Sequence, residues 1–302
     1  MDVLVVGSMG YDAISTPEGQ GSDLLGGSGT YAGIAAAKMG AKVAVVGVVG
    51  SDFRSEDRHL LEQEGLDLRG LEVAEGATFR WSGMYQDTMA EAVTLSTDLN
   101  VLESFDPKIP AEIAAPSVLL CANLHPSVQA AAMDQVNASR AVMLDSMNLW
   151  IDIAREGLEQ VLKRADIVVL NDGEVRALGA SSTLAVAALR VREMLHDDAV
   201  LVVKRGEHGA YVLHPSGPMS LPAVPSTDLV DPTGCGDSFA GTLAAVLARG
   251  EGPIGRSELR DALEQATAVA SFTLASIGTT SLLGMTEVDR NARLEALRRL
   301  QH

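Results

Sequence analysis

Residues 231–241 read Asp231-Pro232-Thr233-Gly234-Cys235-Gly236-Asp237-Ser238-Phe239-Ala240-Gly241, and an apolar pattern of helical period follows them. Gly234 and Gly236 leave the backbone bare where that helix begins, and unpaired N–H groups at the positive end of a helix dipole bind anions. A carboxylate at Asp237, in the first turn, would stay ionised there and accept a proton from an alcohol. A tight turn with a capping aspartate is the simpler interpretation of G-x-G-D alone. The eleven-residue context favours a phosphate site with a base beside it.

Upstream of this motif, short β-branched runs alternate with segments long enough for helices. The predicted strands are 3–6, 43–49, 118–120, 141–144, 167–170 and 200–203, and the predicted helices are 30–39, 53–63, 126–138, 152–164 and 183–195. Most of the strand runs are continuously apolar, which is typical of strands buried on both faces. Their alternation with helices predicts a parallel α/β sheet covered on both sides. Downstream, the patterns at 236–249, 257–273 and 287–300 predict a helical C-terminal third.

Residues 78–99 break this alternation, because two strand-like runs are joined there by a polar turn. Together with 11–14 and 23–25 they predict a small antiparallel flap, and flaps that close over a substrate exclude water. The sequence shows no repeat and no obvious linker. We therefore expect one domain over residues 1–302, with a lid formed by about residues 11–25 and 76–100 inserted in the core.

Composition excludes several classes of protein. The chain has 302 residues, of which 47% are hydrophobic and 21% charged, so it can bury a sizeable core. A net charge of −17 argues against nucleic acid and anionic membranes as partners. Cys121 and Cys235 are far apart and form no C-x-x-C pair, which favours a reducing compartment, so we expect a cytoplasmic protein without a signal peptide. A Gly-Lys dipeptide is absent, so the sequence holds no Walker A loop.

The 231–241 motif resembles the C-terminal D-T-x-G-A-G-D signature of the ribokinase (PfkB) family of carbohydrate and nucleoside kinases. Pro232 stands in place of the usual threonine and Cys235 in place of alanine. The resemblance implies a ribokinase-like three-layer α/β sandwich with a mostly parallel central sheet and a small β lid. It implies that Asp237 is the catalytic base and that the amides of Gly234, Cys235 and Gly236 stabilise the transferring phosphoryl group. It further implies a monovalent cation such as K⁺ near Asp231.

The same resemblance implies an acceptor site. Gly26-Gly27 is similar to the family's N-terminal glycine signature, and Asp12 matches the acidic residue that binds acceptor hydroxyls. Tyr31 stands where many members carry asparagine, which puts the usual polar contact in question. Arg80 of the lid and Asn148, near a strand end where the family often has D-x-N, complete the expected set. The predicted acceptor-binding residues are Asp12, Gly26, Gly27, Tyr31, Arg80 and Asn148.

Two further segments resemble the nucleotide side of the family's site. Asn171-Asp172-Gly173-Glu174 is similar to the N-x-x-E motif, which organises Mg²⁺ and the phosphates, often through water, and a single glutamate suffices for Mg²⁺. It also reads as a helix cap, and both interpretations hold together. The segment from Lys204 through Gly206 to Gly209 is similar to T-x-G-x-x-G, with lysine in place of threonine. This lysine contacts donor phosphates in one interpretation and is a paired strand-end charge in the other.

These features predict a kinase that transfers the γ-phosphoryl group of ATP, with Mg²⁺, to a primary hydroxyl of a nucleoside or sugar. Tyr31, Trp81 and Tyr85 offer flat surface on which a base could stack, which favours a nucleoside slightly. The alternatives are a kinase of free ribose- or fructose-type sugars and a ligand-binding sensor on the same fold that has lost turnover. The family resemblance also suggests a homodimer formed through the lid, although Thr94, Ser96 and Asp98 make that face polar.

Overall fold

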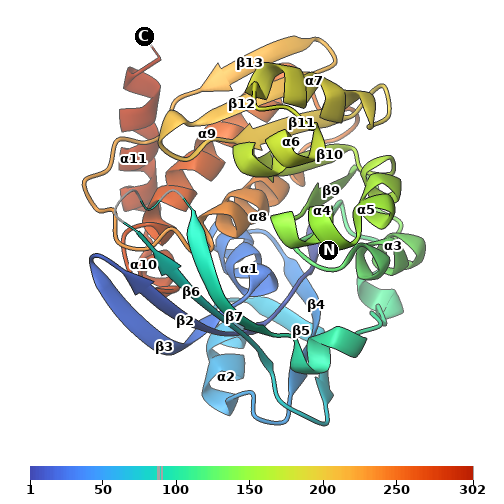
Figure 1. The fold of residues 1–302 in the computed structure, drawn as a ribbon, viewed down its shortest axis with the longest axis vertical. Coiled ribbons are helices and arrows are strands. Elements are labelled where there is room, and N and C mark those ends of the chain that lie inside the picture. The colour runs from blue at the N-terminus through green and yellow to red at the C-terminus, as the bar shows by residue number, and fades with distance from the viewer. Residues whose placement is uncertain (87–88, 90, 302) are drawn as a thin grey trace.

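The fold is built around a central sheet with the strand order β13-β12-β11-β10-β9-β8-β1-β4-β5 (Figure 1). It is seen in a computed structural model that describes residues 1–86, 89 and 91–301. The strands from β11 to β5 in this order pair in parallel, whereas β12 and β13 are antiparallel. The strands are β1 (Val3–Val6), β4 (Val43–Gly50), β5 (Leu66–Ala74), β8 (Val118–Cys121), β9 (Ala141–Asp145), β10 (Ile167–Asn171), β11 (Val200–Lys204), β12 (Ala210–His214) and β13 (Gly217–Leu221).

Helices cover both faces of this sheet, which makes three layers. Alternate strand residues belong to two separate hydrophobic cores: Val3 and Val5 to one, Leu4 and Val6 to the other. The first core includes residues of α1 (Ser28–Lys38), α2 (Ser55–Gln63), α8 (Cys235–Leu247), α9 (Arg256–Thr273) and α10 (Thr280–Gly284). The second includes residues of α3 (Pro126–Gln135), α4 (Asn148–Ile153), α5 (Arg155–Leu162), α6 (Asp172–Leu178) and α7 (Leu184–Glu193), while α11 (Glu287–Arg299) packs on α9.

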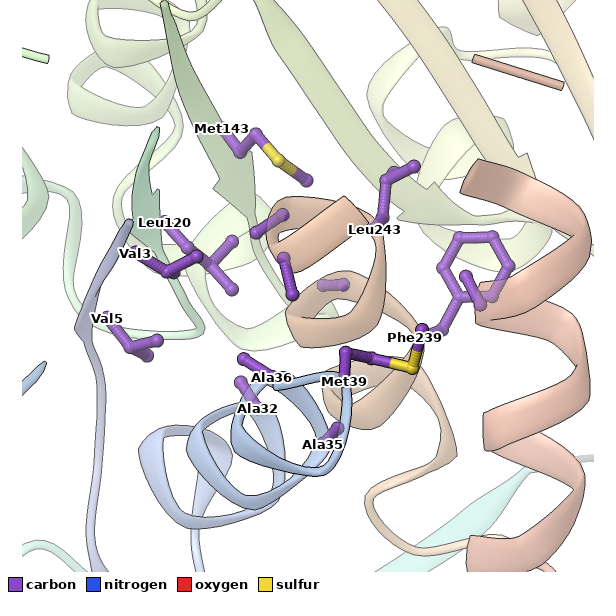
Figure 2. Packing of buried hydrophobic residues seen from close by; sticks show 14 of the residues in the cluster. Val3, Val5, Ala32, Ala35, Ala36, Met39, Leu120, Met143, Phe239 and Leu243 are labelled. Atoms are coloured by element: carbon purple, nitrogen blue, oxygen red, sulfur yellow. The ribbon is translucent and has the colours of Figure 1, made fainter. Parts of the chain in front are cut away.

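Small side chains let α1 and α8 pack closely beneath the sheet. Ala32, Ala35 and Ala36 of α1 lie in the same hydrophobic core as Leu243 of α8, and Figure 2 shows the three alanines along α1. A Cβ built on Gly241 would lie 2.1 Å from the carbonyl oxygen of Ala32, so a larger residue there would push the helices apart. The N-terminal turns of both helices carry residues singled out in the sequence.

A second, four-stranded sheet stands apart from the central one, in the order β3-β2-β6-β7 (Figure 1). Its strands are β2 (Gly10–Thr16), β3 (Gly19–Gly26), β6 (Phe79–Tyr85) and β7 (Ala92–Asp98). The expectation of a purely antiparallel flap is wrong, because β2 and β6 pair in parallel. Each of these two strands follows a strand of the central sheet, and both run outward in the same direction. We call this unit the small sheet.

The edge strand β7 is exposed along most of its length, including Val93 and Leu95. A dimer through this edge stays a prediction, as do the boundaries of the lid and the single-domain organisation. Among the described residues, the helices are too short or too polar to cross a membrane.

Candidate active site

The predicted anion-binding motif lies where the loop 222–234 enters α8. Gly234 adopts φ 76° and ψ −1°, a left-handed conformation that favours glycine, and no side chain of the described residues caps the helix. The amide of Cys235 donates to the carbonyl oxygen of Pro232 at 3.1 Å, whereas the amides of Gly234 and Gly236 have no backbone partner among the described residues and can bind an anion. Asp231 is fully buried and fixes the loop: its carboxylate accepts hydrogen bonds from the amides of Thr233 and Gly278, each at 2.9 Å.

Asp237 lies in the first turn of α8 and is half-buried. Burial raises the pKa of its carboxyl group to about 7, and the negative charge of Asp145 adds to the rise, whereas Lys204 opposes it. A carboxylate with a pKa near neutrality is suited to accept a proton from an alcohol at physiological pH. The geometry thus places a carboxylate next to the start of α8, as the predicted base and anion site require.

A buried ion pair borders Asp237. Lys204 Nζ donates to both carboxylate oxygens of Asp145, at 3.2 Å and 3.0 Å. Burial alone would lower the pKa of Lys204, but Asp145, Glu174 and Asp237 outweigh it and raise that pKa, so the ammonium stays charged. We call Asp12, Asp145, Glu174, Lys204, Asp231 and Asp237 the charged cluster.

Glu174 closes a capping box at the start of α6. Its Oε2 accepts from the amide of Asn171 at 2.7 Å and its Oε1 from Asn171 Nδ2 at 2.6 Å, while the Glu174 amide donates to Asn171 Oδ1 at 2.8 Å. The helix-cap interpretation of this motif is therefore confirmed. Burial raises the pKa of Glu174 to about 8. Its remaining lone pairs can accept hydrogen bonds from metal-bound water, the contact that its predicted role requires.

Asp12 approaches the same region from β2. It is 4% exposed, and burial together with Asp237 and Asp231 raises its pKa to about 7. A Cβ on Gly26 would lie 2.0 Å from Asp12 Oδ2, so the predicted glycine is needed for the carboxylate to occupy this place. Gly27 precedes α1 as its N-cap residue.

Tyr31 lies between the acceptor-side and phosphate-side residues. Its ring packs against Gly234, where a Cβ would come within 2.4 Å of ring atoms. The side chain is 1% exposed, and its hydroxyl has no hydrogen-bond partner within the part of the chain that the structure describes. A buried hydroxyl without a partner is costly, which makes Tyr31 a natural donor or acceptor for a bound ligand.

The small sheet reaches the motif through Tyr85. Thr233 Oγ1 donates to the hydroxyl oxygen of Tyr85 at 3.2 Å, so the end of β6 is tied to the loop before α8. In the β2–β6 register Asp12 is paired with Trp81, which places both on one face of the small sheet. Sequence reasoning did not foresee the Tyr85–Thr233 contact, because 148 residues separate its partners.

The remaining predicted residues lie in different surroundings. Arg80 is paired in register with Tyr11, on the face opposite Asp12, and forms ion pairs with Asp23 and Asp52. The register therefore gives no support to an acceptor contact by Arg80. Asn148 is exposed at the start of α4, and Asp145, three residues earlier, joins the charged cluster in its stead.

Gly206 and Gly209 form the turn that follows Lys204. The amide of Arg205 donates to the carbonyl oxygen of Gly209 at 2.8 Å, which closes the turn between β11 and β12. A surface cavity of about 670 Å³ lies elsewhere, along α3, α4 and α5, with Pro126 and Ile153 among its lining residues. This cavity is separate from the charged cluster. We place the candidate active site at the charged cluster, because groups with perturbed pKa values gather at functional sites.

Comparison with known proteins identifies relatives along almost the whole chain. The sequence model for pfkB family carbohydrate kinase matches residues 1–284. A cytidine kinase of Thermococcus kodakarensis is 28% identical over 258 residues, covering 83% of this chain and 90% of that protein. A fructokinase of Salmonella typhimurium is 29% identical over 265 residues, covering 82% of this chain and 85% of that protein.

Solved structures share the fold. A nucleoside kinase of Methanocaldococcus jannaschii, an archaeal member of the ribokinase family, has a TM-score of 0.78 at 18% identity over 98% of both chains. An aminoimidazole riboside kinase of Salmonella enterica, solved with aminoimidazole riboside and an ATP analogue, has a TM-score of 0.77 at 19% identity, covering 97% of this chain and 99% of that one. The predicted ribokinase-like sandwich is thereby confirmed. Since the family model spans 284 of the 302 residues, the chain belongs to the pfkB family of carbohydrate kinases, phosphotransferases that act on hydroxyl groups.

Proposed function

We propose that the protein transfers the γ-phosphoryl group of ATP to a primary hydroxyl of a nucleoside. The observation that carries this proposal is the position of Asp237, a half-buried carboxylate with a pKa of about 7 in the first, uncapped turn of α8. In this position it accepts the proton of the attacking hydroxyl while the first-turn amides stabilise the phosphoryl oxygens. The acceptor oxygen forms the new bond to phosphorus, and ADP leaves.

Magnesium enters this scheme with the nucleotide. The described residues contain no group of three or more His, Cys, Asp or Glu side chains placed to hold a metal ion. Glu174 fits a supporting role through water, because both of its oxygens already accept hydrogen bonds from Asn171. Bound Mg²⁺ would neutralise charge on the phosphates. A monovalent cation near Asp231 stays a prediction.

Two observations favour a nucleoside over a free sugar. Asp12 and Trp81 share one face of the small sheet, so a carboxylate for ribose hydroxyls lies beside an aromatic ring for a base. Tyr31, also expected to offer stacking surface, gives no such support, because its ring is 1% exposed and packs against Gly234. A relative over most of the chain is a cytidine kinase. The fructokinase relative keeps the free-sugar alternative in the test.

The test is an acceptor panel with ATP and Mg²⁺. Adenosine, inosine, guanosine and cytidine are compared with ribose and fructose by their specificity constants. We expect a nucleoside to exceed every free sugar by more than tenfold. A free sugar that exceeds the nucleosides by that margin would overturn the acceptor assignment and leave the kinase intact. ATP binding without phosphorylation of any alcohol would favour the sensor.

Asp12 makes a finer prediction about the sugar. Its carboxylate is buried, and a buried acceptor deprived of its donors costs about 1–3 kcal/mol. Ribonucleosides should therefore exceed their 2′- or 3′-deoxy analogues by roughly ten- to a hundredfold in kcat/KM. Asp12→Asn keeps the shape and is the matched control. If wild type and Asp12→Asn show the same ratio, Asp12 does not bind the diol.

A further inference from the structure

Lys204 places a positive charge against the positive end of a helix. It ends β11, and a Cβ built on Gly236 in the first turn of α8 would lie 2.8 Å from its Nζ. A larger residue at position 236 would displace the ammonium group from this place. The Lys204 side chain is 17% exposed, so a ligand at the helix terminus can reach it.

This placement would be unfavourable without negative charges beside it. A cation is repelled by the N-terminal end of a helix dipole. The carboxylates of Asp145, Glu174 and Asp237 offset the repulsion and keep the lysine charged. The ammonium and the first-turn amides of α8 thus converge on one place, where a phosphoryl group would contact both.

The hydrogen-bond geometry of Lys204 leaves a donor for that contact. An ammonium has three N–H groups. Two of them serve the oxygens of Asp145, and among the described residues no other acceptor is bonded to Lys204 Nζ. Asp145 is 3% exposed and is itself held by the Ser146 amide, which donates to its Oδ1 at 2.9 Å. Asp145 therefore fixes the direction in which the third N–H points.

We propose that Lys204 is a catalytic residue that contacts the transferring phosphoryl group, and that Asp145 is the positioning residue that holds it there. The proposal rests on the proposed function. The bond between the γ-phosphorus and the β–γ bridging oxygen breaks, and its electron pair leaves with ADP. The acceptor oxygen bonds to the γ-phosphorus, and its proton passes to Asp237. Lys204 stabilises the charge on the γ-phosphoryl oxygens during this exchange.

The test separates this role from a structural one. Lys204→Met alone leaves Asp145 buried without its partner, which destabilises a protein, so the double variant K204M/D145N is measured beside it. We expect kcat to fall by about 10²–10³-fold in both, with KM for the acceptor within about threefold of wild type. Asp145→Asn should lower kcat while retaining the lysine, and the double variant should be no worse than Lys204→Met, because the two residues act as a unit. A merely structural pair would lower the thermal midpoint and leave kcat unchanged.

The matched control is Lys38→Met. Lys38 lies in the last turn of α1, at the end away from the candidate active site, and its Nζ forms an ion pair of 2.8 Å with Glu64. We expect its kcat to stay at the wild-type value. If K204M/D145N keeps kcat within about threefold of wild type, or raises only KM for ATP, the catalytic assignment of Lys204 is overturned.

A second measurement distinguishes failure of this proposal from failure of the proposed function. Inorganic phosphate is used as the probe, and the thermal midpoint is followed in wild type and K204M/D145N. Phosphate should raise the midpoint of wild type and not that of the double variant. This result would support the anion contact even if wild type phosphorylated no alcohol, in which case the proposed function alone fails. Equal responses, or no response in wild type, would overturn the role of Lys204.

Discussion

The carboxylate of Asp237 has two roles that an experiment must separate. In the first turn of a helix it stabilises the helix, and it can also act as a base. Asp237→Asn removes the proton acceptor with almost no change in shape. We expect kcat to fall by at least about a hundredfold, with KM for ATP and acceptor nearly unchanged. In wild type, kcat/KM should fall as the pH decreases through about 7, where the carboxylate becomes protonated. Unchanged turnover in the variant would reduce Asp237 to a helix-favouring residue.

The same carboxyl group should make the folded protein less stable at alkaline pH. Its pKa is raised from 3.8 to about 7 on folding, so between these values the native state binds a proton that the unfolded state has lost. The free energy of unfolding therefore decreases as pH rises through this window. Asp237→Asn should raise the thermal midpoint at pH 8, by roughly 2–4 °C for each kcal/mol, and change it little near pH 4. Thermal unfolding at the two pH values measures this; equal shifts at both would show that the pKa is not raised.

Single residues also show where sequence patterns end. Each of the six predicted strands begins at the residue where the observed strand begins. Each ends at the observed last residue or one residue before it. The extra final residues of β9, β10 and β11 are Asp145, Asn171 and Lys204. A strand predicted from an apolar run ends before the first polar residue. The prediction therefore omits the polar residue at the strand end that belongs to the candidate site. The chemistry lies at those carboxyl ends, as expected for an open parallel sheet.

At the scale of elements, the strands that the sequence predicts well are those buried on both faces of the central sheet. Strands of the parallel core are continuously apolar and are visible without any knowledge of their partners. The strands β12 and β13 are antiparallel and end the sheet, and β13 contains Pro218, so their patterns are weak. The predicted helix over 152–164 covers the end of α4 and all of α5, which are separated at Ala154. Contacts such as Lys204–Asp145, 59 residues apart, follow from the assembled sheet and from no local pattern.

The junction of α1 and α8 supports a further prediction. Gly234→Ala would force a side chain into the left-handed region, at about 1–2 kcal/mol, and into the ring of Tyr31. Gly40→Ala is the matched control, because Gly40 has φ 79° with nothing within 4 Å of its Cβ position. We expect the free energy of unfolding to fall further in Gly234→Ala, by about 1–3 kcal/mol more, and turnover to be lost only there. Urea unfolding and kcat measure this, and equal losses in the two variants would exclude the ring contact.

At the scale of the whole molecule, the strand order places the site. From β1 the chain moves to β4 and β5 on one side and then returns to β8 on the other, so the order reverses between β1 and β8. The Ser28 hydroxyl of α1 accepts from the Ser8 amide at 3.1 Å and donates to the carbonyl of Asn123 at 3.3 Å, which ties α1 to both strand ends. Ligands bind at such reversals in open α/β sheets, and the predicted acceptor-side residues Gly27 and Tyr31 lie on either side of Ser28, at the N-cap and in the first turn of α1.

The negative charge of the molecule bears on the proposed role of Mg²⁺. The net charge is −17, and the charged cluster holds five carboxylates against one lysine, although its function requires an anionic nucleotide. The described residues hold no group of three or more His, Cys, Asp or Glu side chains placed for a metal ion. A cation bound to the nucleotide phosphates, as proposed above, would offset the negative charge.

Chelation should therefore abolish phosphoryl transfer without lowering the thermal midpoint, and added Mg²⁺ should restore the rate. Glu174→Gln keeps the size of the side chain that caps α6 and replaces one of its two acceptor oxygens with an NH2 group that can only donate. It should raise the Mg²⁺ concentration needed for half-maximal rate several-fold, while KM for the acceptor stays near that of wild type. Activity titrations with Mg²⁺, beside thermal unfolding in chelator, make the comparison. A midpoint that falls by many degrees in chelator alone would reveal a structural metal and contradict the delivery of Mg²⁺ by the nucleotide.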